Sequence, residues 1–169
     1  MTRREWHRQA AARLDAAGRP DAAFDARCLL EAFGGLARGH QPDETALSAA
    51  QVAALTAALE ERLAGRPLQY ILGEWDFLDL TLRVGEGVLI PRADTEVLCE
   101  TAADRLSGIP SPRLLDLCAG SGCVGLGMTS LCPGAAVTAV EWSEEALTYL
   151  RDNIAHYPDR RGTAVRADV

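Results

Sequence analysis

The feature that most constrains this 169-residue chain is an alternation of apolar strand patterns and helical patterns that begins near Arg113. A strand–helix–strand–helix–strand series folds into parallel strands joined by right-handed crossovers. The sequence therefore predicts an α/β fold that contains the first βαβαβ half of a Rossmann-like sheet. The expected strands and helices, in chain order, are 114–118, 122–132, 136–141, 143–156 and 163–167.

The N-terminal region has a helical pattern instead. Capping boxes at Thr2 and Ser48 predict the starts of two amphipathic helices, and Asp21 is expected to cap a third helix between them. This middle helix should stop at Gly34. Three such helices in this length are typical of a small helical bundle, so we expect 1–66 to form an N-terminal helical domain.

Between these two regions the apolar period changes from that of a helix to that of a strand. Alternating apolar residues on both sides of Asp79 predict a β-hairpin, so 68–92 should consist of strands and connections. Asp94 or Thr95 should then cap a helix that ends near Gly108. The expected domains are the helical domain 1–66, a hairpin linker 67–92 and an α/β domain 93–169.

The first strand of the α/β domain leads directly into a turn that contains glycines. Gly120 and Gly122 would let a ligand approach the backbone closely, and the amide groups at the start of the next helix would face that ligand. A nucleotide-like ligand is therefore expected. The spacing Gly120-x-Gly122-x-x-Gly125, with Glu141 placed to hold ribose hydroxyls, also matches a dinucleotide fingerprint, so an NAD-dependent enzyme is one interpretation.

Asp116 favours a different ligand. A carboxylate before the glycine turn would repel a pyrophosphate, whereas it suits the cationic methionyl portion of S-adenosylmethionine. The methyl donor is therefore the preferred interpretation over NAD. Two simpler roles stay open: Asp116 could cap backbone amides, and Glu141 could be a solvated charge at the end of a strand.

The charge and the cysteines narrow the class of function. The net charge is −7, and residues 76–169 hold fourteen acidic residues against eight Arg, so direct nucleic-acid binding is disfavoured. The five cysteines lack the spacing of a zinc site, so we expect no metal site and reduced thiols. No apolar run approaches the roughly 20 residues of a membrane span, and no signal core is seen, so a cytoplasmic protein without a membrane segment is expected.

Four segments of the chain together resemble one enzyme family. They are Pro67-Leu68-Gln69-Tyr70-Ile71-Leu72-Gly73, Phe77, Gly87-Val88-Leu89-Ile90-Pro91-Arg92-Ala93-Asp94-Thr95-Glu96 and Asp116-Leu117-Cys118-Ala119-Gly120-Ser121-Gly122. This ordered set resembles the HemK/PrmC family of protein-(glutamine-N5) methyltransferases. The resemblance implies methyl transfer from S-adenosylmethionine to the glutamine side chain in the Gly-Gly-Gln motif of peptide chain release factors. It also implies that 1–66 recognises the protein substrate and that 93–169 is part of a methyltransferase domain.

The resemblance further implies which residues form the site. The implied cofactor-binding residues are Asp116, Cys118, Ala119, Gly120, Ser121, Gly122, Glu141, Asp168 and Val169, the last two beside the adenine. The implied substrate-side residues are Ile90, Pro91, Arg92 and Thr95. For Arg92, an ion pair with Glu96 one helical turn on is an equal alternative. Two positions depart from the family: Ala93 stands where proline is frequent, and Cys118 stands where glycine is frequent.

The family's Asn-Pro-Pro-Tyr motif does not occur in this sequence. In the family its asparagine side chain and proline carbonyl would hold the substrate amide in line with the methyl group, so no catalytic residue can be named here. We therefore expect a truncated, inactive chain that binds the cofactor weakly and self-associates through strand 114–118 as an exposed edge. A non-catalytic cofactor- or protein-binding fragment and a nucleic-acid adenine N6-methyltransferase are the alternatives.

Overall fold

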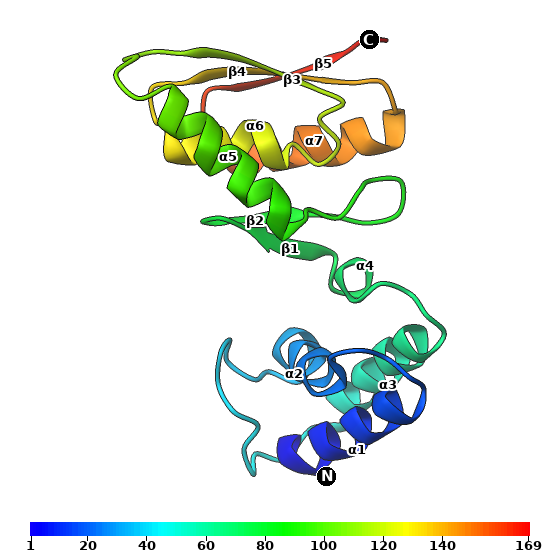
Figure 1. The fold of residues 1–169 in the computed structure, drawn as a ribbon. Coiled ribbons are helices and arrows are strands. Elements are labelled where there is room, and N and C mark those ends of the chain that lie inside the picture. Colours follow the sequence, from blue (N-terminus) through cyan, green and yellow to red (C-terminus); the bar gives the residue numbers. More distant parts are fainter. The chain divides into compact units, whose positions relative to one another are not determined.

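A computed structural model describes residues Met1–Val169, and the chain divides into two compact units (Figure 1). The first unit is Met1–Leu72 and the second is Gly73–Val169. The first unit is all helical, whereas the second combines a hairpin, a parallel sheet and three helices. No helix in either unit has the length and apolar character needed to cross a membrane.

The helical unit is built on the two capping boxes that the sequence predicts. Thr2 accepts the Glu5 N–H at 3.2 Å and its own N–H donates to the Glu5 carboxylate at 2.8 Å, while Ser48 and Gln51 do the same two helices later. Apolar side chains from three of the helices meet in one core: Trp6, Ala10, Leu14, Leu29, Leu30, Leu55 and Leu59. The helices are α1 (Arg3–Ala16), α2 (Ala22–Phe33), α3 (Ala49–Leu63) and the short α4 (Leu68–Leu72).

Three expectations about local structure are wrong. Asp21 does precede α2, but it has a left-handed backbone (φ 57°) and its side chain makes no capping hydrogen bond. Residues 68–72 form a helical turn and not a strand, because Pro67 is well suited to a first turn and its carbonyl accepts the N–H groups of Tyr70 and Ile71. Neither Asp94 nor Thr95 caps the next helix. Its N-cap is Arg92, which follows a proline and is extended.

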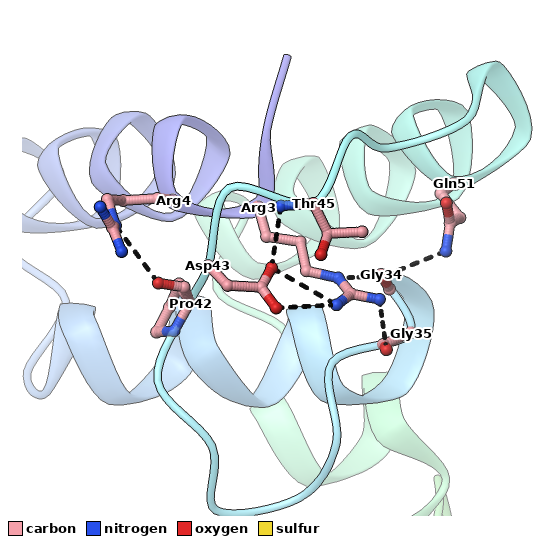
Figure 2. Close-up of polar contacts among 8 residues, drawn as sticks. All are labelled: Arg3, Arg4, Gly34, Gly35, Pro42, Asp43, Thr45 and Gln51. Atoms are coloured by element: carbon pink, nitrogen blue, oxygen red, sulfur yellow. Dashed lines mark hydrogen bonds and ion pairs between the residues drawn. The ribbon is translucent and has the colours of Figure 1, made fainter.

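Arg3 fixes the loop between α2 and α3 (Figure 2). Its guanidinium donates to the carbonyl groups of Gly34 and Gly35, at 3.1 and 2.5 Å, and forms an ion pair with Asp43 at 3.3 Å. Gln51 donates to the same Gly34 carbonyl at 3.0 Å. Carbonyl groups at the C-terminus of a helix lack intrahelical partners and carry partial negative charge, so a cation is favourable there.

A second ion pair in this unit is almost completely buried. Arg62 Nε in α3 lies 2.6 Å from Asp25 Oδ2 in α2, and the two side chains are 13% and 6% exposed. Arg62 also donates to the carbonyl of Arg66. Burial raises the pKa of the Asp25 carboxyl, and Arg62 counteracts only part of that rise. The pair therefore joins α2 to α3 through charges that have lost most of their water.

The second unit contains the predicted βαβαβ series, and its α/β class is confirmed. The strands β3 (Arg113–Leu117), β4 (Ala136–Glu141) and β5 (Gly162–Arg166) are parallel in the order β3-β4-β5, with Leu115 opposite Thr138 and Thr138 opposite Thr163. The helices α5 (Ala93–Arg105), α6 (Cys123–Leu131) and α7 (Glu144–His156) all lie on one side of this sheet (Figure 1). On the other face Leu115 and Leu117 are 63% and 50% exposed.

The predicted hairpin is β1 (Glu74–Phe77) and β2 (Leu80–Arg83), paired antiparallel around Leu78 and Asp79. Its apolar face packs against α5 and α6, in a cluster that joins Phe77, Leu80, Leu82, Cys99, Leu126 and Met128. Gly127 allows this close approach, because a Cβ atom there would lie 2.8 Å from Phe77 Cε1. The hairpin is thus part of the packed core of the second unit.

The outer edge of β2 is bound by side chains of α7 and the residue after it. The Tyr157 hydroxyl accepts the N–H of Thr81 at 2.8 Å and donates to its carbonyl at 2.9 Å. Asn153, one helical turn earlier, does the same for Arg83, with Oδ1 accepting the N–H at 2.7 Å and Nδ2 donating to the carbonyl at 3.1 Å. These side chains take the place of a neighbouring strand, so the backbone groups of this edge are satisfied.

Candidate functional site

The loop Cys118–Gly122 joins β3 to α6 and changes backbone direction three times. Cys118, Gly120 and Gly122 all have positive φ, at 58°, 56° and 82°. The loop is held to the sheet and to itself, since Ala119 N–H donates to the Val140 carbonyl at 2.9 Å and Gly122 N–H to the Ala119 carbonyl at 2.8 Å. A left-handed non-glycine residue costs about 1–2 kcal/mol, which explains why glycine suits the position that Cys118 occupies.

The two glycines of the loop have different surroundings. A Cβ at Gly122 would lie 2.6 Å from Leu150 Cδ1, so this glycine is needed for packing against α7. A Cβ at Gly120 would meet only Val88 Cγ2, at 3.8 Å, so this glycine borders open space. A ligand could therefore approach the backbone at Gly120 and not at Gly122.

Gly125, the third glycine of the spacing, brings α6 close to the sheet. A Cβ there would lie 2.8 Å from Val137 Cγ1 and 3.1 Å from Asp116 Oδ2. Asp116 Oδ2 accepts the Gly125 N–H at 2.9 Å, so Asp116 does cap backbone at the start of α6. Burial raises the pKa of the Asp116 carboxyl and the charge of Glu141 adds to the rise, while the Gly125 hydrogen bond opposes it. Binding a cation beside this carboxyl would favour its charged form.

Glu141, at the end of β4, is tied to the same loop. Its Oε2 accepts the N–H of Gly120 at 2.8 Å, and its Oε1 accepts the N–H groups of Trp142 and Ser143, each at 2.8 Å. These three bonds mean that Glu141 is not simply a solvated charge. The structure thus brings together Asp116, Gly120 and Glu141, which are the residues that the glycine pattern predicts.

The remaining predicted residues are more scattered. Asp168 and Val169 are exposed after β5, Ile90 and Pro91 are buried, Arg92 is exposed and Thr95 is half-buried. The alternative ion pair between Arg92 and Glu96 is not formed. Glu96 Oε1 instead accepts the N–H of Leu78 at 2.8 Å and so holds the turn of the hairpin.

Two residues near the loop are not singled out by the sequence. Trp142 follows Glu141 directly, is 59% exposed, and lies 5.7 Å from the guanidinium of Arg166, which is ion-paired with Glu144. Asn153 is completely buried, and its Nδ2 donates to the carbonyl of Ser121 in the loop at 2.9 Å. An aromatic residue after a strand-end acid could have identified Trp142, whereas a single Asn in an amphipathic helix carries no such signal.

The thiols differ sharply in their surroundings. Burial raises the pKa of Cys28 and of Cys99 to about 11, and burial also raises the pKa of Cys123. Cys118 in the loop is exposed. No three His, Cys, Asp or Glu side chains in the structure are grouped so that they could hold a metal ion.

Comparisons with known proteins agree with the sequence motifs. Residues 5–73 match the family model described as the PrmC N-terminal domain. The release factor glutamine methyltransferase of Chlorobaculum tepidum is 44% identical over 132 residues, which are 75% of this chain and 45% of that protein. That of Deinococcus radiodurans is 37% identical over 164 residues, which are 92% and 56% of the two chains. This chain therefore spans about half the length of the curated relatives that it matches.

Among solved structures, the precorrin-6y C5,15-methyltransferase of Geobacter metallireducens aligns with a TM-score of 0.41 and 21% identity. The alignment covers 51% of this chain and 44% of that protein. The resemblance that the ordered motifs predict is confirmed by the family model and the sequence relatives.

Proposed function

The chain is homologous to the HemK/PrmC family, and from this premise we propose that it carries the cofactor-binding part of a release factor glutamine methyltransferase. The proposed reaction transfers a methyl group from S-adenosylmethionine to the glutamine side chain in the Gly-Gly-Gln motif of a peptide chain release factor. The observation that carries the proposal is the open backbone at Gly120, whose N–H donates to Glu141, in the loop that follows Asp116.

The proposed roles follow from charge and hydrogen-bonding capacity. Asp116 uses Oδ2 to hold Gly125, and in the proposal its negative charge faces the ammonium group of the methionyl portion. Glu141 accepts three backbone N–H groups, and a carboxylate has about four acceptor sites, so it retains capacity for one ribose hydroxyl. Asp168 and Val169 would then lie beside the adenine. When bound, the cofactor supplies an activated methyl group on its sulfonium.

Besides the cofactor loop, the reaction needs groups that hold the substrate amide. An amide nitrogen is a weak nucleophile, so it must be held in line with the methyl group by acceptors for its two N–H bonds. The sequence contains no Asn-Pro pair to supply them. We propose that Ile90, Pro91, Arg92 and Thr95 contribute the substrate side of the pocket, and that 1–66 recruits the release factor.

Cys118 offers a direct test of the cofactor assignment. Cys118 is the exposed thiol of the loop, whereas Cys28 and Cys99 are buried with a pKa of about 11, so an alkylating reagent should modify Cys118 first. A ligand over the loop should slow this modification roughly tenfold at about ten times its Kd. The rate is measured by mass spectrometry of the Cys118 peptide with and without S-adenosylmethionine.

Cys132 is the internal control for this experiment. It lies at the other end of α6, so its alkylation should not respond to the cofactor. Protection by NAD instead of S-adenosylmethionine would favour a dinucleotide enzyme. Equal rates at Cys118 with and without S-adenosylmethionine would contradict the proposed function.

The helical unit should affect recognition of the protein substrate and not binding of the cofactor. Deleting residues 1–66 from the protein as its gene encodes it should raise the KM for a release factor and leave the cofactor constant unchanged. The reason is that the Gly120 loop and both carboxylates belong to the second unit. Steady-state kinetics with each substrate varied in turn measures both constants. A raised cofactor KM with an unchanged release-factor KM would refute this division.

A further inference from the structure

Asn153 joins the glycine loop to the hairpin through every polar atom of its side chain. The residue is 0% exposed, and its Nδ2 donates both to the Ser121 carbonyl at 2.9 Å and to the Arg83 carbonyl at 3.1 Å. Its Oδ1 accepts the Arg83 N–H at 2.7 Å. A buried amide of this kind is stable only with all partners present, because each unmatched buried group costs about 1–3 kcal/mol.

Asn153 belongs to a series of contacts between the α7 region and residues 81–87, in which β2 ends at Arg83 and a turn follows at 86–87. Tyr157 contacts Thr81 and Asn153 contacts Arg83. Continuing in the same direction, a Cβ at Gly85 would overlap Tyr149 Oη, and a Cβ at Gly87 would lie 2.6 Å from Glu145 Oε2. Every fourth residue from 145 to 157 therefore faces every second residue from 87 to 81. Four helical residues rise about 6 Å and two extended residues about 6.6 Å, so the spacing matches along β2, and the turn at 86–87 then brings Gly87 against Glu145.

Within this series Asn153 alone also reaches the loop. The peptide between Ser121 and Gly122 is held at both ends, since its carbonyl accepts from Asn153 and its N–H donates to the Ala119 carbonyl. Glu141 holds the N–H of Gly120 on the other side of Ser121. Because Gly120 and Gly122 both have positive φ and can rotate more freely than other residues, the orientation of this peptide depends on these three bonds.

We propose that Asn153 is a positioning residue that presets the glycine loop for its ligand and couples the loop to the hairpin segment. The same amide fixes Arg83, five residues before Val88, whose side chain borders the open space at Gly120. Asn153 thus bonds to the loop on one side of that space and to the segment that leads to Val88 on the other. This inference deepens the proposed function, and it rests on that function for the identity of the ligand.

The test compares Asn153→Asp and Asn153→Ser with Tyr157→Phe. Asn153→Asp keeps the size of the side chain and the acceptor for Arg83 N–H but removes both donated bonds. Tyr157→Phe removes bonds to the same strand without reaching the loop. At temperatures where each variant is folded by circular dichroism, the Asn153 variants should bind S-adenosylmethionine roughly tenfold more weakly by calorimetry. Tyr157→Phe should bind within about twofold of wild type, while its melting temperature falls.

A second readout does not depend on the ligand. In the free protein, hydrogen exchange at the amides of Gly120 and Gly122 should become faster in the Asn153 variants and stay unchanged in Tyr157→Phe. If the wild type failed to bind S-adenosylmethionine, the proposed function would fall, and this exchange pattern would still decide the role of Asn153. The inference is overturned by unchanged exchange and affinity in folded Asn153 variants, or by a Tyr157→Phe variant that loosens the loop equally.

Discussion

Replacing Gly120 with valine is expected to weaken S-adenosylmethionine binding by at least about 100-fold, which corresponds to about 2.7 kcal/mol. The Cβ position at Gly120 meets only Val88, at 3.8 Å, so the branched side chain fits the free protein and occupies the space proposed for the ligand. The positive φ of 56° adds strain, because β-branched residues rarely adopt this region. Calorimetric titration of the folded variant measures the loss.

Gly108→Val is the matched control. Gly108 also has a positive φ, 88°, and open space at its Cβ position, and it follows α5 away from the loop. This variant should lose comparable stability and keep its cofactor affinity. If Gly120→Val bound S-adenosylmethionine as tightly as the wild type, the assignment of the ligand to this loop would be abandoned.

Replacing Arg62 with methionine is expected to lower the free energy of unfolding of the helical unit by about 3–5 kcal/mol. The substitution leaves the Asp25 carboxyl, which is only 4% exposed at the residue level, without its cation. Urea unfolding can be followed by the fluorescence of buried Trp6 after Trp75 and Trp142 are replaced with phenylalanine. In the double variant with Asp25→Leu, most of the lost stability should return, because no uncompensated charge remains buried.

The loss of unfolding free energy caused by Arg62→Met should also depend on pH. Without Arg62 the pKa of Asp25 rises further above its unfolded value, so the native state binds the proton more tightly than the unfolded state does. The stability that this proton contributes is present below the unfolded pKa and is lost as pH rises through the folded pKa. The free energy of unfolding of the variant should therefore be closest to that of the wild type near pH 4 and furthest below it near pH 7. A pH-independent deficit would show that lost packing, not charge, dominates.

Local sequence signals predict the elements that depend on local physics. The capping boxes at Thr2 and Ser48 place α1 and α3 correctly, since a cap involves residues three positions apart. The alternation of strand and helix likewise predicts that β3, β4 and β5 are parallel. Asp21 misleads because the residue type suits a cap, while its backbone is left-handed and its side chain makes no capping hydrogen bond.

For the candidate site, the sequence predicts the residues near the glycine turn but not those that hold the turn in place. Asp116, Gly120 and Glu141 stand at fixed distances from strand ends, so a pattern identifies them. Asn153 acts through backbone groups of Ser121 and Arg83, which are 32 and 70 positions away. Backbone partners leave no trace in side-chain identity, so only the folded structure reveals this connection.

The contacts between the α7 region and residues 81–87 also limit where residues can be inserted into the chain. One residue inserted between Arg83 and Gly85 would move Gly85 out of register with α7 and place a side chain where Tyr149 now meets glycine. An insertion at the hairpin turn, Leu78–Asp79, would leave all four contacts in place. Among natural variants of this protein, length differences are therefore expected at the turn and not within 81–87.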